Sequence, residues 1–183
     1  MFSKENKTTK NRGIFLDRDG VINQAVVENG RPFPPASLKD MVIIPGVYEA
    51  LTKLKSENWF LIVVTNQPDV ARGLTSKSTV EEINQYLKNY LPIDEILSCF
   101  HDNSDQCLCR KPQPGLILQA AKKYGIELAS SFMIGDRWRD VQAGQSAGCK
   151  TIFIDYEYKE KRPDTYDYKV SSFKEASRII RGQ

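Results

Sequence analysis

The chain has 183 residues, 40% of them hydrophobic and 27% charged, which is enough to bury a full core as one globular domain. Its formal net charge of +3 is too small to indicate a nucleic-acid-binding protein. No apolar run approaches the length of a membrane span, and the polar N-terminal extension, residues 1–12, has no signal-peptide pattern. We therefore expect a cytoplasmic protein.

The first predicted strand ends in two acidic residues. Residues 14–16 are apolar, and Asp17 and Asp19 follow directly, with Gly20 allowing a sharp turn after them. Side chains two residues apart on an extended chain project to the same side, so both carboxylates can face one site. Two close carboxylates favour a cation between them, and oxygen ligands suit Mg²⁺. The alternative is that both residues only cap a turn.

The next segment, residues 24–44, contains Arg31-Pro32-Phe33-Pro34-Pro35 and predicts a stiff, irregular loop. This loop either lies over the mouth of the site or is a surface loop without a role. A helix opens at Pro45-Gly46, because the apolar residues from Val47 onward follow helical spacing. Residues 60–64 predict a second buried strand, which ends in Thr65, Asn66 and Gln67. Thr79 and Glu82 have the spacing of a capping box for the following helix.

A third strand is predicted over residues 96–100 and leads into a cysteine-rich loop, residues 99–109. The loop contains the chain's single histidine and has the pattern Cys99-x-His101 followed by Cys107-x-Cys109. These side chains supply the four ligands of a closed tetrahedral Zn²⁺ site, so we predict structural zinc here. The alternative is a set of free thiols beside a surface histidine. Cys149 lies outside the cluster and is expected to be a small core residue.

The rest of the chain continues the alternation of strands and helices. Arg110 and Lys111 follow the cysteine-rich loop, called the zinc loop from here on. A helix then closes at Gly125. A strand over residues 132–136 ends in Asp136, and the next helix carries Asp140. A fifth strand over 150–155 and a last helix over about 172–180 complete a core of residues 13–181. The alternation predicts an α/β fold, with a doubly wound, mostly parallel sheet in a single domain and no large cap domain.

The polar residues named in the preceding paragraphs lie at or just after the ends of predicted strands. In a parallel sheet these strand ends lie at one edge. Together these residues supply the parts that phosphoryl transfer needs. We expect Asp17 to be the nucleophile and Asp19 the general acid and base. Mg²⁺ is expected to be held by Asp17, Asp136 and the backbone carbonyl of Asp19, while Asp140 either joins this site or only favours the helix start. The expected phosphate and substrate ligands are Thr65, Asn66, Gln67, Arg110 and Lys111.

In this order, Asp17-x-Asp19-Gly20, Thr65-Asn66-Gln67, Lys111-Pro112 and Gly135-Asp136-x-x-x-Asp140 resemble the four motifs of the haloacid dehalogenase superfamily of phosphatases. Ala71-Arg72-Gly73 and the zinc loop resemble its small, cap-less branch, which contains histidinol-phosphate phosphatases and D-glycero-D-manno-heptose 1,7-bisphosphate 7-phosphatases. The resemblance spans about residues 14–155. It implies the same catalytic pair, with Thr65 and Lys111 stabilising phosphate, Arg110 contacting substrate and Asp136 binding Mg²⁺.

The resemblance implies a Mg²⁺-dependent phosphatase acting on a small sugar phosphate, with the heptose 7-phosphate as the preferred hypothesis. Pro68-Asp69 and the loop at residues 31–35 depart from the pattern of that branch, so the substrate stays open. Alternatives are a histidinol-phosphate phosphatase, a polynucleotide 3′-phosphatase and a non-enzymatic regulator that keeps its phosphate on Asp17. The small net charge and the absence of an aromatic stacking groove oppose nucleic acid as a partner. We expect a monomer with no membrane contact.

Overall fold

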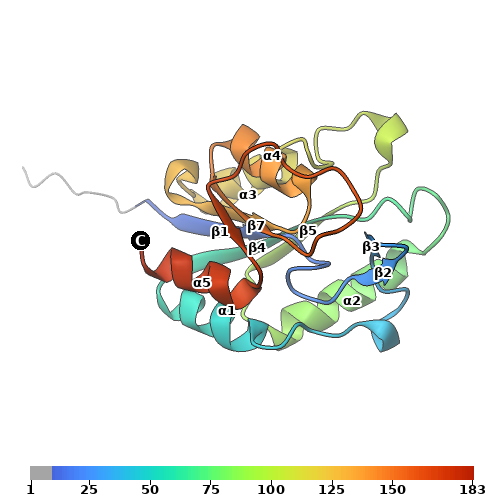
Figure 1. Cartoon of the computed structure of the whole chain (residues 1–183), viewed down its shortest axis with the longest axis horizontal. Helices are drawn as coiled ribbons and strands as arrows, with labels where there is room; N and C mark the ends of the chain where they lie inside the picture. Colours follow the sequence, from blue (N-terminus) through green and yellow to red (C-terminus); the bar gives the residue numbers. More distant parts are fainter. Residues whose placement is uncertain (1–9) are drawn as a thin grey trace, which may run out of the picture.

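The computed structural model describes residues 10–183 and contains a six-stranded sheet in the order β5-β4-β1-β6-β7-β8 (Figure 1). Every neighbouring pair in this sheet is parallel. The strands are β1 (Arg12–Leu16), β4 (Trp59–Asn66), β5 (Glu95–Cys99), β6 (Phe132–Gly135), β7 (Lys150–Ile154) and β8 (Tyr168–Val170). The predicted parallel α/β sheet is therefore confirmed, and β8 is a sixth strand that the sequence did not indicate.

Helices cover both faces of the sheet, as a doubly wound fold requires (Figure 1). They are α1 (Val47–Ser56), α2 (Lys77–Tyr90), α3 (Gly115–Tyr124), α4 (Trp138–Ala147) and α5 (Phe173–Arg181). In β1, Ile14 and Leu16 join the core cluster that includes residues of α1, α2 and α5, whereas Phe15 joins the cluster that includes residues of α3 and α4. This division follows from the alternation of side chains along a strand.

The segment after β1 is more regular than expected. It forms an antiparallel hairpin of β2 (Val26–Glu28) and β3 (Arg31–Phe33), followed by a 3₁₀-helix, Leu38–Asp40. Asn29 and Gly30 both have positive φ angles, 52° and 82°, which suit a tight two-residue hairpin turn. The prediction of an irregular loop is wrong here, because the turn signal of Asn29-Gly30 outweighs the prolines nearby.

Two predicted boundaries also need correction. Helix α2 begins at Lys77, and the Ser76 hydroxyl accepts a hydrogen bond from the Thr79 backbone N–H at 3.0 Å. The predicted capping box at Thr79 and Glu82 is therefore wrong, since Ser76 caps the helix one turn earlier. Strand β1 begins at Arg12, inside the predicted N-terminal extension, and residues 1–9 of that extension lie outside the described residues.

No cap domain is inserted within residues 10–183. Outside the sheet and its five helices, the secondary structure consists of the hairpin and the 3₁₀-helices Leu38–Asp40, Asn103–Asp105 and Leu128–Ser130. None of the helices in this part of the chain is both long and apolar enough to cross a membrane. The carboxyl edge of the sheet is therefore covered by loops and the hairpin.

Candidate active site

A cavity of about 260 Å³ lies at the carboxyl edge of the central strands. Asp17 follows β1, Asp136 follows the neighbouring β6, and Asn66 ends β4 on the other side of β1. All three line the cavity, together with Asp19 and Lys111. The expectation that separate strand ends meet at one site therefore agrees with the structure.

Lys111 joins two of the carboxylates. Its ammonium group lies 2.8 Å from Asp17 Oδ1 and 2.6 Å from Asp140 Oδ1, and it donates to the Val64 carbonyl at 2.8 Å. An ammonium has three donors, so all of them are used. Asp140 also accepts a hydrogen bond from the Arg137 backbone N–H at 3.0 Å through its other oxygen. Asp140 is therefore a support for Lys111 as well as a helix-start carboxylate.

Asp136 is the carboxylate in this group without a partner. It is buried, and neither of its oxygens has a hydrogen-bond partner among residues 10–183. Carboxylate oxygens of Asp17, Asp136 and Asp140 all lie within 4.8 Å of one another. An unpaired buried carboxylate is costly, and a hard cation satisfies it. These residues therefore fit the predicted Mg²⁺, which Asp17 and Asp136 would hold through their side chains.

Gly20 is required for this close arrangement. Its φ angle is +86°, and a Cβ atom added there would lie 1.9 Å from Asp136 Oδ2. Any other residue would therefore collide with the carboxylate and also strain the backbone.

The charges of the cluster shift its acid equilibria. Burial is the largest cause that raises the pKa of Asp17 to about 6, with Lys111 opposing it and the carboxylates of Asp140 and Asp19 adding to it. Burial, followed by Asp140 and Asp17, raises the pKa of Asp136 well above its usual range. Burial lowers the pKa of Lys111, but Asp140 and Asp17 outweigh it and the net shift is upward. The site therefore has an excess of negative charge that a cation stabilises.

The three residues at and after the end of β4 lie in different places. Asn66 lines the cavity, and its side chain both donates to the Lys111 carbonyl and accepts from the Lys111 N–H. Gln67 is buried and donates to Asp19 Oδ2 at 2.8 Å and to the Thr65 hydroxyl at 2.9 Å. The structure thus places Asn66 at the cavity and against Lys111, and places Gln67 against Asp19.

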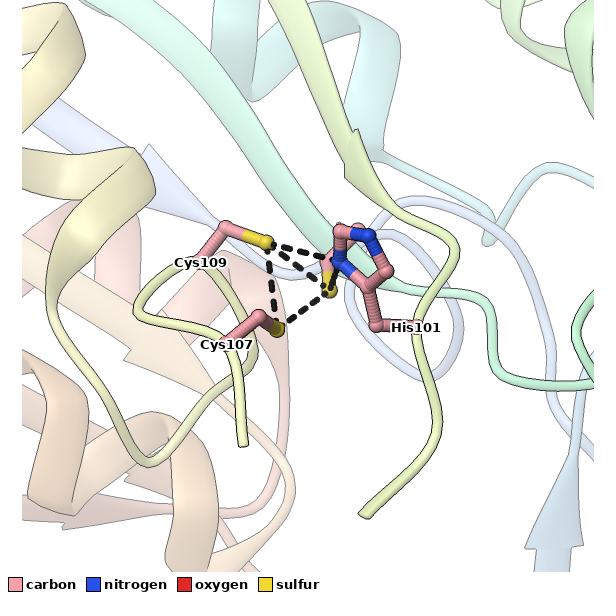
Figure 2. Close-up of side chains that lie close together, drawn as sticks. His101, Cys107 and Cys109 are labelled. Atoms are coloured by element: carbon pink, nitrogen blue, oxygen red, sulfur yellow. Dashed lines mark hydrogen bonds between the residues drawn. The ribbon is translucent and has the colours of Figure 1, made fainter. Parts of the chain in front are cut away.

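The predicted zinc ligands lie together in the loop after β5. Figure 2 shows His101, Cys107 and Cys109 pointing toward one another, and ligand atoms of these three and Cys99 all lie within 4.8 Å. The three sulfur–sulfur distances are 3.2, 3.3 and 3.7 Å, and all four cysteines of the chain are free. Tetrahedral Zn²⁺ with bonds of about 2.3 Å places sulfur atoms about 3.8 Å apart, so the ligand set fits this ion once the two shorter sulfur pairs move apart by about 0.5 Å.

The zinc loop is tied to the wall of the cavity. Arg110 donates to the side chain of Asn103 at 3.0 Å and to the His101 carbonyl at 3.2 Å. Arg72 forms two hydrogen bonds with Asp102, of 2.9 and 2.7 Å, and a third with Asp69. Both arginines line the cavity, so their positions depend on the conformation of the loop.

Basic residues that the sequence analysis did not assign to the site also line the cavity. Arg31 comes from β3 of the hairpin, while Arg137 and Arg139 come from the start of α4. The sequence did contain a signal for Arg137 and Arg139, because both follow closely after Asp136. The first turn of a helix after a strand-end carboxylate faces the same edge of the sheet. Together with Arg72 and Arg110, these residues form a set of basic side chains that line the cavity, here called the basic rim.

Comparison with known proteins identifies related sequences over nearly the whole chain. Residues 108–176 match the HAD-hydrolase-like family. A D-glycero-beta-D-manno-heptose-1,7-bisphosphate 7-phosphatase of Helicobacter pylori is 36% identical over 177 residues, which cover 93% of this chain and 98% of the relative. A D-glycero-alpha-D-manno-heptose-1,7-bisphosphate 7-phosphatase of Photorhabdus laumondii is 34% identical, with coverage of 76% and 80%.

A solved structure agrees with these relatives. The D,D-heptose 1,7-bisphosphate phosphatase of B. bronchiseptica, complexed with magnesium and phosphate, is similar with a TM-score of 0.78 and 28% sequence identity. The similarity covers 93% of this chain and 98% of that one. The likeness therefore extends over nearly the whole of both chains and is not confined to a single motif.

Proposed function

The chain belongs to the haloacid dehalogenase-like phosphatases, and we propose that it hydrolyses the 7-phosphate of D-glycero-D-manno-heptose 1,7-bisphosphate. The observation that carries this proposal is the pairing of Asp17 with Lys111 beside the unpartnered Asp136 in one cavity. This group combines a nucleophile, a cation that attracts phosphoryl oxygens and a vacant oxygen ligand for a metal. Two relatives that cover most of the chain are named for this substrate, which supports the specific choice.

In the proposed reaction, an oxygen of Asp17 attacks phosphorus and the bond from phosphorus to the sugar oxygen breaks. The bonding electron pair goes to the sugar oxygen, which takes a proton from Asp19. Water then attacks the phosphorus of the aspartyl phosphate and gives a proton to Asp19. Asp17 leaves as a carboxylate, so inorganic phosphate is released and both residues return to their starting forms.

Asp17 and Asp136 would hold Mg²⁺, with the carbonyl of Asp19 as a further predicted ligand. When bound, the ion offsets the negative charge of the phosphoryl oxygens. Lys111, fixed by Asp140 and Asn66, supplies a second positive charge to the same oxygens. Thr65 and Gln67 are both buried, and the Gln67 amide donates to the Thr65 hydroxyl and to Asp19.

The basic rim favours a bisphosphate over histidinol phosphate. Arg31, Arg110 and Arg139 line the cavity in addition to the groups that surround the reacting phosphate. A second phosphate adds negative charge that guanidinium groups bind well. Histidinol phosphate instead carries an amine and an imidazole at its other end. The basic side chains of the rim repel these groups or leave them without a partner.

We propose structural rather than catalytic zinc in the loop. Four protein ligands close a tetrahedral site and leave no position for substrate or water. The hydrogen bonds from Arg72 to Asp102 and from Arg110 to Asn103 support a role in holding the cavity wall.

Phosphate release with Mg²⁺ tests the function. The panel contains both anomers of heptose 1,7-bisphosphate, histidinol phosphate and a 3′-phosphorylated oligonucleotide, and phosphorus NMR shows which heptose phosphate is lost. We expect loss of the 7-phosphate of a heptose anomer, abolished in Asp17→Asn. The matched control is Asp164→Asn, because the Asp164 side chain is 88% exposed and lies outside the cavity.

Faster hydrolysis of histidinol phosphate or of the oligonucleotide would contradict the proposed substrate and leave a phosphatase of another specificity. A stable phosphoprotein on Asp17, with no turnover of any ester, would instead indicate the regulator.

A further inference from the structure

The carboxylate of Asp19 is held by four N–H donors. The Arg18 guanidinium supplies two of them, from Nε to Oδ1 at 3.2 Å and from Nη2 to Oδ2 at 3.1 Å. Asn23 donates to Oδ1 at 2.9 Å, and Gln67 donates to Oδ2 at 2.8 Å. An ionised carboxylate has about four lone-pair sites, so one of these contacts has to open when Asp19 carries a proton.

Arg18 is suited to keep the carboxylate in place during that step. Its side chain is fully buried, with 0% exposed, whereas the Asp19 side chain is 15% exposed and borders the cavity. A buried guanidinium is costly unless each donor is satisfied, and two parallel contacts with one carboxylate fix the plane of that carboxylate. If the single contact from Gln67 or Asn23 opens, the double contact from Arg18 still sets the direction of Asp19.

Arg18 is itself oriented by two residues from other elements. Its Nη1 donates to Asn84 Oδ1 at 3.0 Å, and Asn84 Nδ2 donates to the Ser98 hydroxyl at 3.0 Å. Asn84 lies on α2 and Ser98 on β5, so the contacts run from the outer strand of the sheet to Asp19. Because one end of the Asn84 amide accepts and the other donates, the two partners fix which way the amide faces.

We infer that Arg18, Asn84 and Ser98 are positioning residues that hold Asp19 in the direction needed for proton transfer to the leaving oxygen. The inference rests on the proposed function, in which Asp19 protonates the sugar oxygen as the phosphorus–oxygen bond breaks. It is independent of substrate binding, because neither Asn84 nor Ser98 lines the catalytic cavity. Both line a separate surface groove between α2 and β5 instead.

The geometry makes Asn84 the residue to change. Removing its amide leaves an Arg18 N–H buried without a partner and lets the guanidinium turn, while the cavity wall stays the same. The effect should depend on the leaving group. A sugar alkoxide needs the proton of Asp19, whereas p-nitrophenolate is a weak base that leaves without one.

The experiment compares Asn84→Ala with the wild-type protein, with Mg²⁺, on the heptose bisphosphate and on p-nitrophenyl phosphate. General acid catalysis contributes about 100-fold or more, so a misdirected Asp19 should lower kcat/KM for the sugar ester at least about tenfold, with less than about a threefold loss of kcat/KM on the aryl ester. This ratio covers only the steps up to departure of the leaving group, so it leaves out the hydrolysis of the aspartyl phosphate, in which Asp19 acts on both esters. KM for the sugar ester should stay within about twofold, because the substrate contacts are intact.

Asn84→Asp keeps an acceptor for Arg18 and should restore most of the activity on the sugar ester. Gln85→Ala is the matched control. Gln85 lines the same groove, and within the described residues its side chain forms a hydrogen bond only with Asn89. Ser98→Ala should show a smaller loss of activity, again on the sugar ester more than on the aryl ester. If thermal melting shows that Asn84→Ala is not folded, Ser98→Ala is the variant that tests the inference.

Equal losses of kcat/KM on both esters, or no loss on either, would overturn the inference while leaving the phosphatase in place. A wild-type protein that releases phosphate from neither ester would contradict the proposed function, and the inference with it. These results are distinguishable because Asp17→Asn abolishes both reactions, whereas the positioning variants are expected to separate them.

Discussion

Lys111 balances the charges in the cavity. It is buried, and its ammonium contacts the carboxylates of Asp17 and Asp140 together with one backbone carbonyl. Both carboxylates raise its pKa against the opposing effect of burial, so the lysine stays charged at neutral pH. Breaking a buried ion pair from one side is far more costly than its net contribution, because it leaves an uncompensated charge.

We therefore expect Lys111→Met to be both inactive and unstable. Loss of the cation should lower the free energy of unfolding by about 3–5 kcal/mol and should reduce kcat at least about 100-fold. Urea denaturation and phosphate release measure the two effects. Lys122→Met is the control, because Lys122 is exposed on α3 and should change neither quantity. Stability equal to that of the wild type would mean that the pairing with Asp17 and Asp140 does not stabilise the fold.

The raised pKa of Asp17 predicts how Mg²⁺ binding depends on pH. Burial lifts this pKa to about 6 in the metal-free protein, so ionising Asp17 is harder in the folded chain than in the unfolded one. The contribution of this group to stability is therefore largest at low pH and is lost as pH rises through about 6. Magnesium binds the ionised form and should restore that stability.

Thermal melting with and without Mg²⁺ tests this sign. The increase in Tm caused by Mg²⁺ should be large near pH 7.5 and should largely disappear near pH 5, where Asp17 holds a proton. Asp17→Asn is expected to weaken the pH dependence of the Mg²⁺ effect without removing it, because the pKa of Asp136 is also raised by burial. A Mg²⁺ effect of equal size at both values would show that protonation of Asp17 does not compete with the metal.

At the scale of elements, the zinc loop connects the proposed zinc site to the cavity through its own side chains. The Asp102 side chain accepts a hydrogen bond from Arg72, and the Asn103 side chain accepts one from Arg110. Cys107→Ser should remove the bound zinc and lower both Tm and kcat/KM, because the loop no longer holds these arginines. Metal analysis, thermal melting and phosphate release measure the three changes.

Cys149→Ala is the control for the zinc variant. Cys149 is buried in the core cluster beside α3 and α4 and lies outside the loop, so this protein should retain one zinc per chain. Full activity in a Cys107→Ser protein shown to lack zinc would contradict the proposed role of the metal.

Elements with a strong local pattern were predictable from the sequence, and those defined by distant contacts were not. The apolar runs of β1, β4 and β6 are buried on both faces, so each appears as a continuous hydrophobic segment that is followed by a polar residue. Strand β8 has three residues and follows a polar loop, and it becomes a strand only through its pairing with β7. Short strands of this kind have no distinguishing periodicity.

The same division applies to the site. Asp17, Asp136 and Asn66 could be placed together because parallel strands end at one edge. The pairing of Lys111 with Asp140, and that of Arg18 with Asn84, depend on side chains that lie far apart in the sequence. No spacing rule relates such residues, so only the folded chain reveals that they meet.

On the scale of the whole molecule, the core and the catalytic edge are built from different parts of the chain. Helix α5 packs on α1, β7 and β8, and no residue of α1 or α5 lines the cavity. Phe173 opens α5 and is 1% exposed within the larger core cluster. Its contribution should therefore be to global stability rather than to the chemistry.

Phe173→Ala tests this separation. Removing a buried phenylalanine leaves a cavity and should lower the free energy of unfolding by about 3–5 kcal/mol. At a temperature well below the lowered Tm, kcat and KM should match the wild type, because the strand ends that carry Asp17 and Asp136 are held by pairing within the sheet. Lys174→Ala, at the exposed neighbouring position, should change stability by less than about 0.5 kcal/mol. If the folded Phe173→Ala protein shows a reduced kcat, packing of α5 and geometry of the catalytic edge are coupled, and the two parts of the molecule are not independent.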